Sequence, residues 1–282
     1  MRPGKLAKRF GHWLGLLPEW IRARALARQE RGRFDALQAF VLFVGYPRSG
    51  HSLVGSLLDA HPDVAIAHEL HVLRYVKYGF GREQIFAMLL ENAAAMADSG
   101  RTVTGYSYAI PGQWQGRTRR LRVLGDKRGG TTIRKLRARP WLLPRLERRI
   151  ALPLRFVHVL RNPFDNIATI CLRGESRTLD ASIEHYFGMV EGVAWLKERL
   201  PTGSVIDVRH EDLVADPAAE LARLCGFLGV EPEPGWLAAC SAAVWKQTHR
   251  SRDGVVWTPA QREEVEKRMA RHPFLAGYGF SA

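Results

Sequence analysis

Cysteine is scarce in this 282-residue sequence, and its three cysteines, Cys171, Cys225 and Cys240, lie far apart along the chain. None belongs to a C-x-x-C pair, and no group of Cys and His has the spacing of a zinc site. The pattern excludes a disulfide scaffold and a zinc finger. We expect reduced thiols and a cytoplasmic protein.

Long apolar runs are also missing, and the longest fall well short of the roughly 20 residues that a membrane-spanning helix needs. The basic N-terminus contains WLGLLPEWI, which is short, is interrupted by proline and lacks a cleavage site, so we do not interpret it as a signal peptide. We expect a helix packed on the domain surface. The alternative is an amphipathic helix through which residues 1–33 contact a membrane.

Acidic residues are too few to balance the basic ones, and the net charge is +14. The excess is local: residues 117–155 hold 14 Lys or Arg and two Asp or Glu, and residues 1–33 hold nine and two. Such segments indicate an anionic ligand, nucleic acid or a membrane surface, or else a solvated basic face. Because no helix-turn-helix, finger or aromatic RNA-binding motif accompanies the charge, we do not expect nucleic acid as a partner.

Buried-strand patterns alternate with amphipathic helix patterns along most of the chain. Strands are expected within 37–45, 63–70, 121–130, 154–163 and 203–213, and helices at 51–60, 82–98, 164–174, 180–199, 216–230, 234–245 and 259–270. The alternation predicts an α/β fold with a parallel central sheet flanked by helices. We divide the chain into a basic helical arm, 1–36, and one domain, 37–282. Ligands of such sheets bind beyond the carboxyl ends of the strands.

The stretch FVGYPRSGHS, residues 43–52, follows the first expected strand. Its glycines and final serine fit the phosphate-loop pattern G-x-x-x-x-G-K-[ST], except that His51 stands at the lysine position. Unpaired amides and the helix dipole at such a turn form an anion site. Arginine adds a planar guanidinium, which can donate two hydrogen bonds to an oxyanion. We therefore predict anion binding by Arg48, Ser49, Gly50, His51 and Ser52.

Two features of a magnesium-dependent kinase are missing from this pattern. The loop lacks its lysine, and the strand at 154–160 ends in Arg161, where a nucleotidase would carry an aspartate. A sulfuryl group carries one negative charge fewer than a phosphoryl group and needs no metal clamp. The pattern therefore favours metal-independent sulfuryl transfer. A magnesium-dependent P-loop kinase and a non-enzymatic basic binding protein are the alternatives.

Four segments, in the expected order, resemble the sulfotransferases that use 3′-phosphoadenosine 5′-phosphosulfate (PAPS). GYPRSGHS resembles the 5′-phosphosulfate loop of that family, and LRNPFDNIAT resembles its 3′-phosphate motif, with Arg161 and Thr169 as the binding residues. RHEDLVADPAAELARLCGFLGV and WTPAQREEVEKRMARHPFLAGYGF are similar to two further segments of the family. The resemblance implies the P-loop-like sulfotransferase fold, with PAPS as the sulfuryl donor and no metal.

The segment PRSGHSLVGSLLDAHPDVAIAHEL most resembles the tyrosylprotein and carbohydrate sulfotransferase branch. That resemblance implies that Glu69 is the general base towards a hydroxyl or amine acceptor, and that Lys127 neutralises the leaving phosphosulfate oxygens. It also implies that Arg173, Ser251 and Arg252 join the nucleotide site. The chain departs from the family at His51, which replaces a loop threonine, and at His210, where tyrosine is usual.

Glu69 also qualifies as a base on chemical grounds, because a strand-end carboxylate near the donor can take the proton of the acceptor. His68 is the rival base, since an unperturbed histidine pKa near ~6.5 suits proton abstraction at neutral pH. We prefer Glu69, and expect the second strand to neighbour the loop at 45–52. The basic block around Lys127 favours an anionic acceptor, such as a glycan or an acidic peptide.

Overall fold

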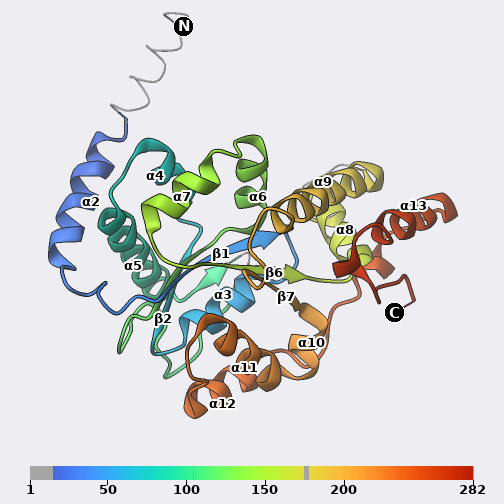
Figure 1. The fold of residues 1–282 in the computed structure, drawn as a ribbon. Coiled ribbons are helices and arrows are strands. Elements are labelled where there is room, and N and C mark those ends of the chain that lie inside the picture. Colours follow the sequence, from blue (N-terminus) through green and yellow to red (C-terminus); the bar gives the residue numbers. More distant parts are fainter. Residues whose placement is uncertain (1–14, 104, 175–177, 282) are drawn as a thin grey trace, which may run out of the picture.

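The structure is a computed structural model that describes residues 15–103, 105–174 and 178–281, so the first 14 residues of the predicted arm lie outside it. Five parallel strands form the central sheet in the order β2-β5-β1-β6-β7. Their bounds are β1 (Ala39–Gly45), β2 (Val64–His68), β5 (Val123–Lys127), β6 (Leu154–Leu160) and β7 (Val205–Arg209). The predicted α/β fold with a parallel sheet is confirmed (Figure 1).

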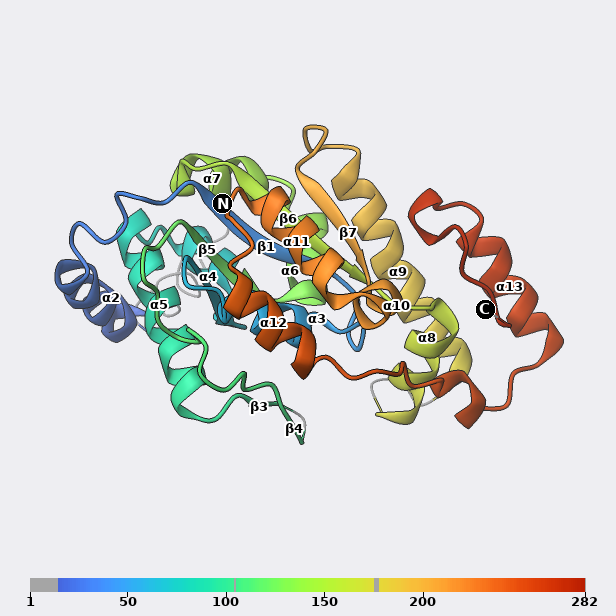
Figure 2. The same cartoon turned by 90° about the horizontal axis from the view of Figure 1, so that it is seen from below.

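Helices cover both faces of the sheet, because alternate residues of each buried strand face opposite sides. Phe40 and Leu42 of β1 join one buried cluster, and Val41 and Phe43 join the other. The first cluster includes α2 (Leu17–Gln29), α4 (Val72–Tyr78), α5 (Arg82–Asp98), α6 (Gly129–Ala138), α7 (Leu142–Ile150), α8 (Pro163–Leu172), α9 (Leu179–Lys197) and α13 (Pro259–Met269). The second includes α3 (His51–Asp59), α10 (His210–Ala215), α11 (Pro217–Leu228) and α12 (Pro234–Ala243), and Figure 2 looks onto this face.

The N-terminal helix α2 packs on the domain, as expected for the described part of the arm. Ala23 and Ala27 of α2 are buried in the same cluster as Phe40 of the central strand. Within the described residues, every helix is too short or too polar to cross a membrane. The division of the chain at residue 36 stays a prediction.

The second strand, β2, is not next to β1 in the sheet, although its carboxyl end reaches the same cleft as the loop at 45–52. β5 lies between β2 and β1, and its Gly125 is in register with Val41. A Cβ at Gly125 would lie 2.6 Å from the carbonyl oxygen of Val41, so glycine permits this close pairing. The position of β5 between β2 and β1 depends on such packing, which the order of strands along the chain does not reveal.

Four α-helices of the described residues were not predicted, and two of them, α6 and α7, lie in the basic block. α6 begins at Gly129, inside the range 121–130 where only a strand was expected, and α7 follows it. α4 follows β2, and α10 lies in the range 203–213, where only a strand was expected. Two short strands, β3 (Thr102–Val103) and β4 (Tyr106–Ser107), lie between residues 101 and 119, where no element was predicted. Arginine and glycine obscured α6 and α7, which are stabilised by packing of Ile133, Leu136 and Leu146 into the core.

Candidate active site

A cleft of about 960 Å³ opens beyond the carboxyl ends of the central strands. It is lined by eleven of the thirteen predicted site residues: Arg48, Gly50, His51, Ser52, His68, Glu69, Lys127, Arg161, Thr169, Arg173 and Ser251. The other two, Ser49 and Arg252, are buried beside it. The fold therefore brings the predicted donor and base residues to one cavity.

The loop after β1 leads directly into α3. Arg48 and Gly50 both have left-handed backbone conformations, with φ of 68° and 103°, which turn the chain sharply before the helix. Gly50 is the N-cap of α3, and no side chain caps the first helical amides. Since residues 50–53 line the cleft, these amides could hold an anion there.

His51 faces the interior of the loop. Its Nε2 lies 3.0 Å from the carbonyl oxygen of Val44 and must donate, while Nδ1 lies 3.0 Å from the hydroxyl of Ser49. Burial lowers the pKa of His51 to about 4, so the ring is neutral. Both side chains therefore brace the loop, and their backbone amides are the groups that remain for a ligand.

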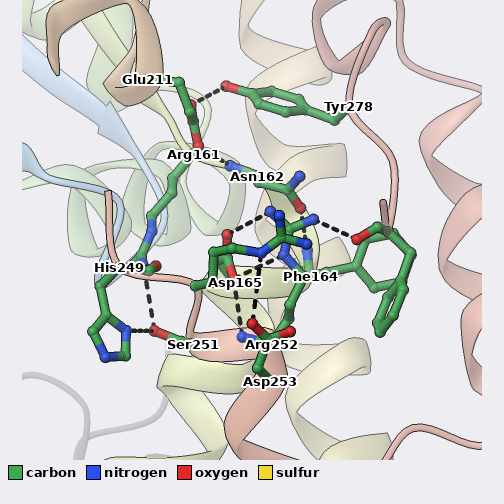
Figure 3. Close-up of polar contacts among 12 residues, drawn as sticks. Arg161, Asn162, Phe164, Asp165, Glu211, His249, Ser251, Arg252, Asp253 and Tyr278 are labelled. Carbon is green, nitrogen blue, oxygen red and sulfur yellow. Dashed lines mark hydrogen bonds and ion pairs between the residues drawn. The ribbon is translucent and has the colours of Figure 1, made fainter. Parts of the chain in front are cut away.

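Arg161, at the end of β6, gathers hydroxyl groups from two other elements. Its guanidinium donates to Thr169 Oγ1 on α8 at 3.3 Å and to Ser251 Oγ at 3.2 Å, in the short helix η1 (Ser251–Gly254). The two hydroxyl oxygens are 2.9 Å apart, and Arg161 also donates to the carbonyl of His249 (Figure 3). A cation and two hydroxyl groups converging on one point suit a phosphate.

Arg252 is buried and its partners lie within the fold. Its Nη2 pairs with Asp165 Oδ2 at 3.0 Å, and its Nη1 donates to the carbonyls of Gly279 and Phe280 at 2.9 and 2.7 Å (Figure 3). Arg252 thus anchors the Ser251 turn to α8 and to the C-terminal segment. Asp165 is thus held by Arg252.

Lys127, at the end of β5, is the centre of a second polar group. Its Nζ lies 3.0 Å from Glu69 Oε1, 3.2 Å from Ser52 Oγ and 3.4 Å from His68 Nε2. The Lys127 side chain is 4% exposed and that of Glu69 is 48% exposed. The predicted base therefore faces the cleft, and the buried ammonium links it to the loop.

The charges in this group affect one another. Burial lowers the pKa of Lys127, although Glu69 opposes that effect. Burial alone would raise the pKa of Glu69, but the adjacent ammonium outweighs it and the pKa is lowered. Burial and Lys127 together lower the pKa of His68 to about 4. At neutral pH Glu69 is a carboxylate and His68 a neutral imidazole, so both are in the form that accepts a proton.

The sequence reasoning missed Asp126, which shapes the backbone around Glu69. Its buried carboxylate accepts hydrogen bonds from the amides of Leu70, His71 and Val72 at 3.1, 2.8 and 2.9 Å. Glu69 itself has a left-handed backbone, with φ of 60°. The available signal was the position of Asp126 at a strand end, immediately before Lys127.

An aromatic and apolar part of the cleft was also missed. Tyr106 and Trp245 pack edge to face with ring centroids 5.5 Å apart, and Leu172 lies in the same wall. Arg173 is exposed and its Nη2 lies 3.5 Å from the Tyr106 hydroxyl. These side chains come from a two-residue strand, the end of a helix and an irregular segment, where periodicity carries no information.

Comparison with known proteins matches one segment of the chain to a family. Residues 151–234, which contain β6, Arg161 and Thr169, match the model of the sulfotransferase family. Over these residues the chain is similar to the sulfotransferase family. This confirms the recognition made from the sequence, whereas the resemblance to the tyrosylprotein and carbohydrate branch stays a prediction. A search of curated proteins found no match.

Solved sulfotransferase structures share the fold of this chain. The sulfotransferase domain of the Synechococcus PCC 7002 olefin synthase is 16% identical with a TM-score of 0.52, covering 82% of this chain and 93% of that one. The domain from the curacin biosynthetic pathway is 17% identical, with a TM-score of 0.52 and coverages of 84% and 98%. Sulfotransferase STF1 from Mycobacterium tuberculosis is 12% identical, with a TM-score of 0.51 and coverages of 88% and 81%.

Proposed function

We propose that this sulfotransferase moves a sulfuryl group from PAPS to a hydroxyl or amine acceptor. The observation that carries the proposal is the presence of two anion sites in one cleft: the loop at 48–52 with Lys127, and the Arg161 cluster. A nucleotide with separate 5′ and 3′ anionic groups matches two such sites. ATP, whose phosphates form one chain, matches only the first.

The donor would lie with its 5′-phosphosulfate on the amides of the loop, beside Arg48 and Ser52. Its 3′-phosphate would bind Arg161, Thr169 and Ser251. During transfer the S–O bond to the 5′-phosphate breaks, and negative charge develops on the bridging oxygen. Lys127, 3.2 Å from Ser52, is the cation in place to stabilise that charge.

The acceptor would attack sulfur from the side of Glu69. Its oxygen or nitrogen forms the new bond to sulfur while its proton passes to the Glu69 carboxylate. The 3.0 Å contact between Glu69 and Lys127 supports this role, because it puts the base beside the stabilised leaving group. His68, also a neighbour of Lys127, is the alternative base.

The lining of the cleft supports an acceptor with apolar parts as well as an anionic one. Tyr106, Leu172 and Trp245 provide apolar contact area. The basic block contributes less than its charge suggests: Arg134 lines the cleft, but Arg137 pairs with Glu191 at 3.2 Å and Arg139 lines a different hollow. Arg134 is therefore the residue of the basic block that would contact an anionic glycan or an acidic peptide.

Calorimetric titration with 3′-phosphoadenosine 5′-phosphate (PAP) tests the donor assignment. We expect micromolar affinity, about −8 kcal/mol, and much weaker binding of ATP. Turnover of PAPS should persist in EDTA, because Lys127 and the loop amides supply the positive charge. Equal affinity for the two nucleotides, or a magnesium requirement, would favour a P-loop kinase.

A further inference from the structure

A second hollow, of about 530 Å³, lies outside the cleft and shares no lining residue with it. It is formed where α4, α6 and the first residue of α7 meet the start of α2. Its lining residues are Gly15, Leu16, Leu73, Arg74, Lys77, Tyr78, Lys135, Arg139 and Leu142. Nothing in the proposed transfer reaction uses it.

Four of the residues around this hollow are basic. Arg74 pairs with Glu19 at 3.0 Å, and Lys77 donates to the Tyr78 hydroxyl at 3.3 Å. Across the described part of the chain, the side chains of Lys135 and Arg139 have no hydrogen bond or ion pair. Residues 1–14, which precede the lining residue Gly15, contain no Asp or Glu. The hollow therefore holds more positive charge than the chain neutralises.

The electrostatics of Lys135 reflect this excess. Burial lowers its pKa, and repulsion from Arg128, Arg139, Lys77 and Arg74 lowers it further. Like charges held this close raise the free energy of the folded state. An anion bound between them would remove that penalty.

Exposed apolar side chains lie next to lining residues of the hollow along the chain. Leu17 is 40%, Ile21 58% and Trp141 47% exposed. Leu17 follows the lining residue Leu16, Trp141 precedes the lining residue Leu142, and Ile21 lies one helical turn beyond Leu17. Figure 1 shows α2, α4 and α7 together at one end of the molecule, opposite α13.

We propose that this face binds an anionic membrane surface, with a lipid headgroup phosphate in the hollow. Trp141, Leu17 and Ile21 enter the interfacial layer. A basic site surrounded by Trp and aliphatic side chains is typical of peripheral membrane contact. Free phosphate or nucleic acid would use the cations but would leave the exposed aliphatic side chains without a role.

Vesicle sedimentation of the full chain tests the proposal. We expect binding to phosphatidylcholine vesicles that contain phosphatidylglycerol, little binding to phosphatidylcholine alone, and weaker binding in high salt. The double variant Lys135→Gln/Arg139→Gln should lose roughly 30-fold in affinity, since each basic residue at a membrane surface contributes about fivefold. Trp141→Ser should reduce the binding that persists in high salt.

A matched control removes the same charge elsewhere. Lys267 and Arg271 are exposed at the α13 end of the molecule, and Lys267→Gln/Arg271→Gln should bind vesicles nearly as the wild type does. Equal loss in the two double variants would overturn the proposal, because net charge alone would then explain binding. PAP titration of Lys135→Gln/Arg139→Gln should be unchanged, so the donor assignment is tested separately.

Two other ligands give distinct results in the same experiment. Saturable binding of inorganic phosphate that depends on Lys135 and Arg139, without vesicle binding, would identify a free-anion site and reject the membrane contact. Retention on heparin that depends on this pair, again without vesicle binding, would identify a polyanion site and also reject it. Thermal unfolding of each variant verifies that the chain is folded.

Discussion

Gly55, on α3, leaves the space that the side chain of Lys127 occupies. A Cβ at position 55 would lie 2.8 Å from Lys127 Cγ and 3.2 Å from its Cβ. The two residues are distant in sequence, yet this contact sets where the Lys127 ammonium meets Glu69 and Ser52. The missing methyl group is therefore part of the geometry of the proposed site.

Gly55→Ala should displace Lys127 and lower kcat by about 10–100-fold, because small misplacements of a charge-stabilising group weaken transition-state stabilisation. Gly226→Ala is the matched control: Gly226 also lies within a helix, and a Cβ there would meet nothing within 4 Å. The control should keep its kcat and gain up to about 1 kcal/mol of stability. Steady-state kinetics and thermal unfolding check both. Unchanged kcat in Gly55→Ala would show that the exact position of Lys127 does not matter.

Arg161→Ala should remove the contribution of the 3′-phosphate to nucleotide binding. We expect the affinity for PAP to fall by about 10–100-fold, the value of one to two charge-assisted hydrogen bonds, while AMP, which lacks the 3′-phosphate, is bound almost as before. Arg48→Ala should weaken both nucleotides, because the loop would hold the 5′-phosphate. Calorimetry with each pair of protein and nucleotide measures this. A similar loss of PAP and AMP affinity in Arg161→Ala would contradict the assignment.

Glu69→Gln should lower kcat by about 10²–10⁴ while the affinity for PAP stays near the wild-type value, since Glu69 would act on the acceptor proton. His68→Gln is made beside it. Activity retained in Glu69→Gln but lost in His68→Gln would make histidine the base. His51 is a poor third choice, because both of its ring nitrogens have partners inside the loop.

His51 should make stability depend on pH. Its pKa is about 4 in the folded chain and 6.5 when unperturbed, so between these values the unfolded chain binds a proton that the folded chain does not. Stability is therefore lost as pH falls from 6.5 towards 4, by up to about 3 kcal/mol from this residue. His51→Gln should flatten the pH dependence by that amount in denaturant titrations at several pH values. An unchanged slope would show that the fold does not lower the pKa of His51.

Arg134→Gln should raise the KM of an anionic acceptor and reduce its salt dependence, because Arg134 lines the cleft. Arg137→Gln removes the same charge from the same helix, but Arg137 pairs with Glu191 and should leave the KM unchanged. Affinity for PAP should be the same in both variants. An equal rise in KM in the two variants would indicate that the basic block acts on the acceptor only through its overall charge.

The amino-acid sequence alone determined the loop at 43–52 and the Arg161–Thr169 pair, because each belongs to one continuous strand–turn–helix unit. In such a unit the apolar run, the glycines or proline and the following amphipathic pattern determine the geometry locally. The alternation of these units likewise predicted the parallel sheet and the edge at which the site lies. Arg161 and Thr169 are eight residues apart, so one short segment brings them together.

Tertiary structure alone decided how the separate units meet. It placed β5 between β1 and β2, and so brought Lys127 to both Ser52 and Glu69. It turned His51 inward, and it brought Ser251 to Arg161 across 90 residues of chain. These contacts depend on close packing between elements distant in sequence, where one absent methyl group or one buried carboxylate decides the arrangement. Such packing leaves no periodic pattern in the sequence.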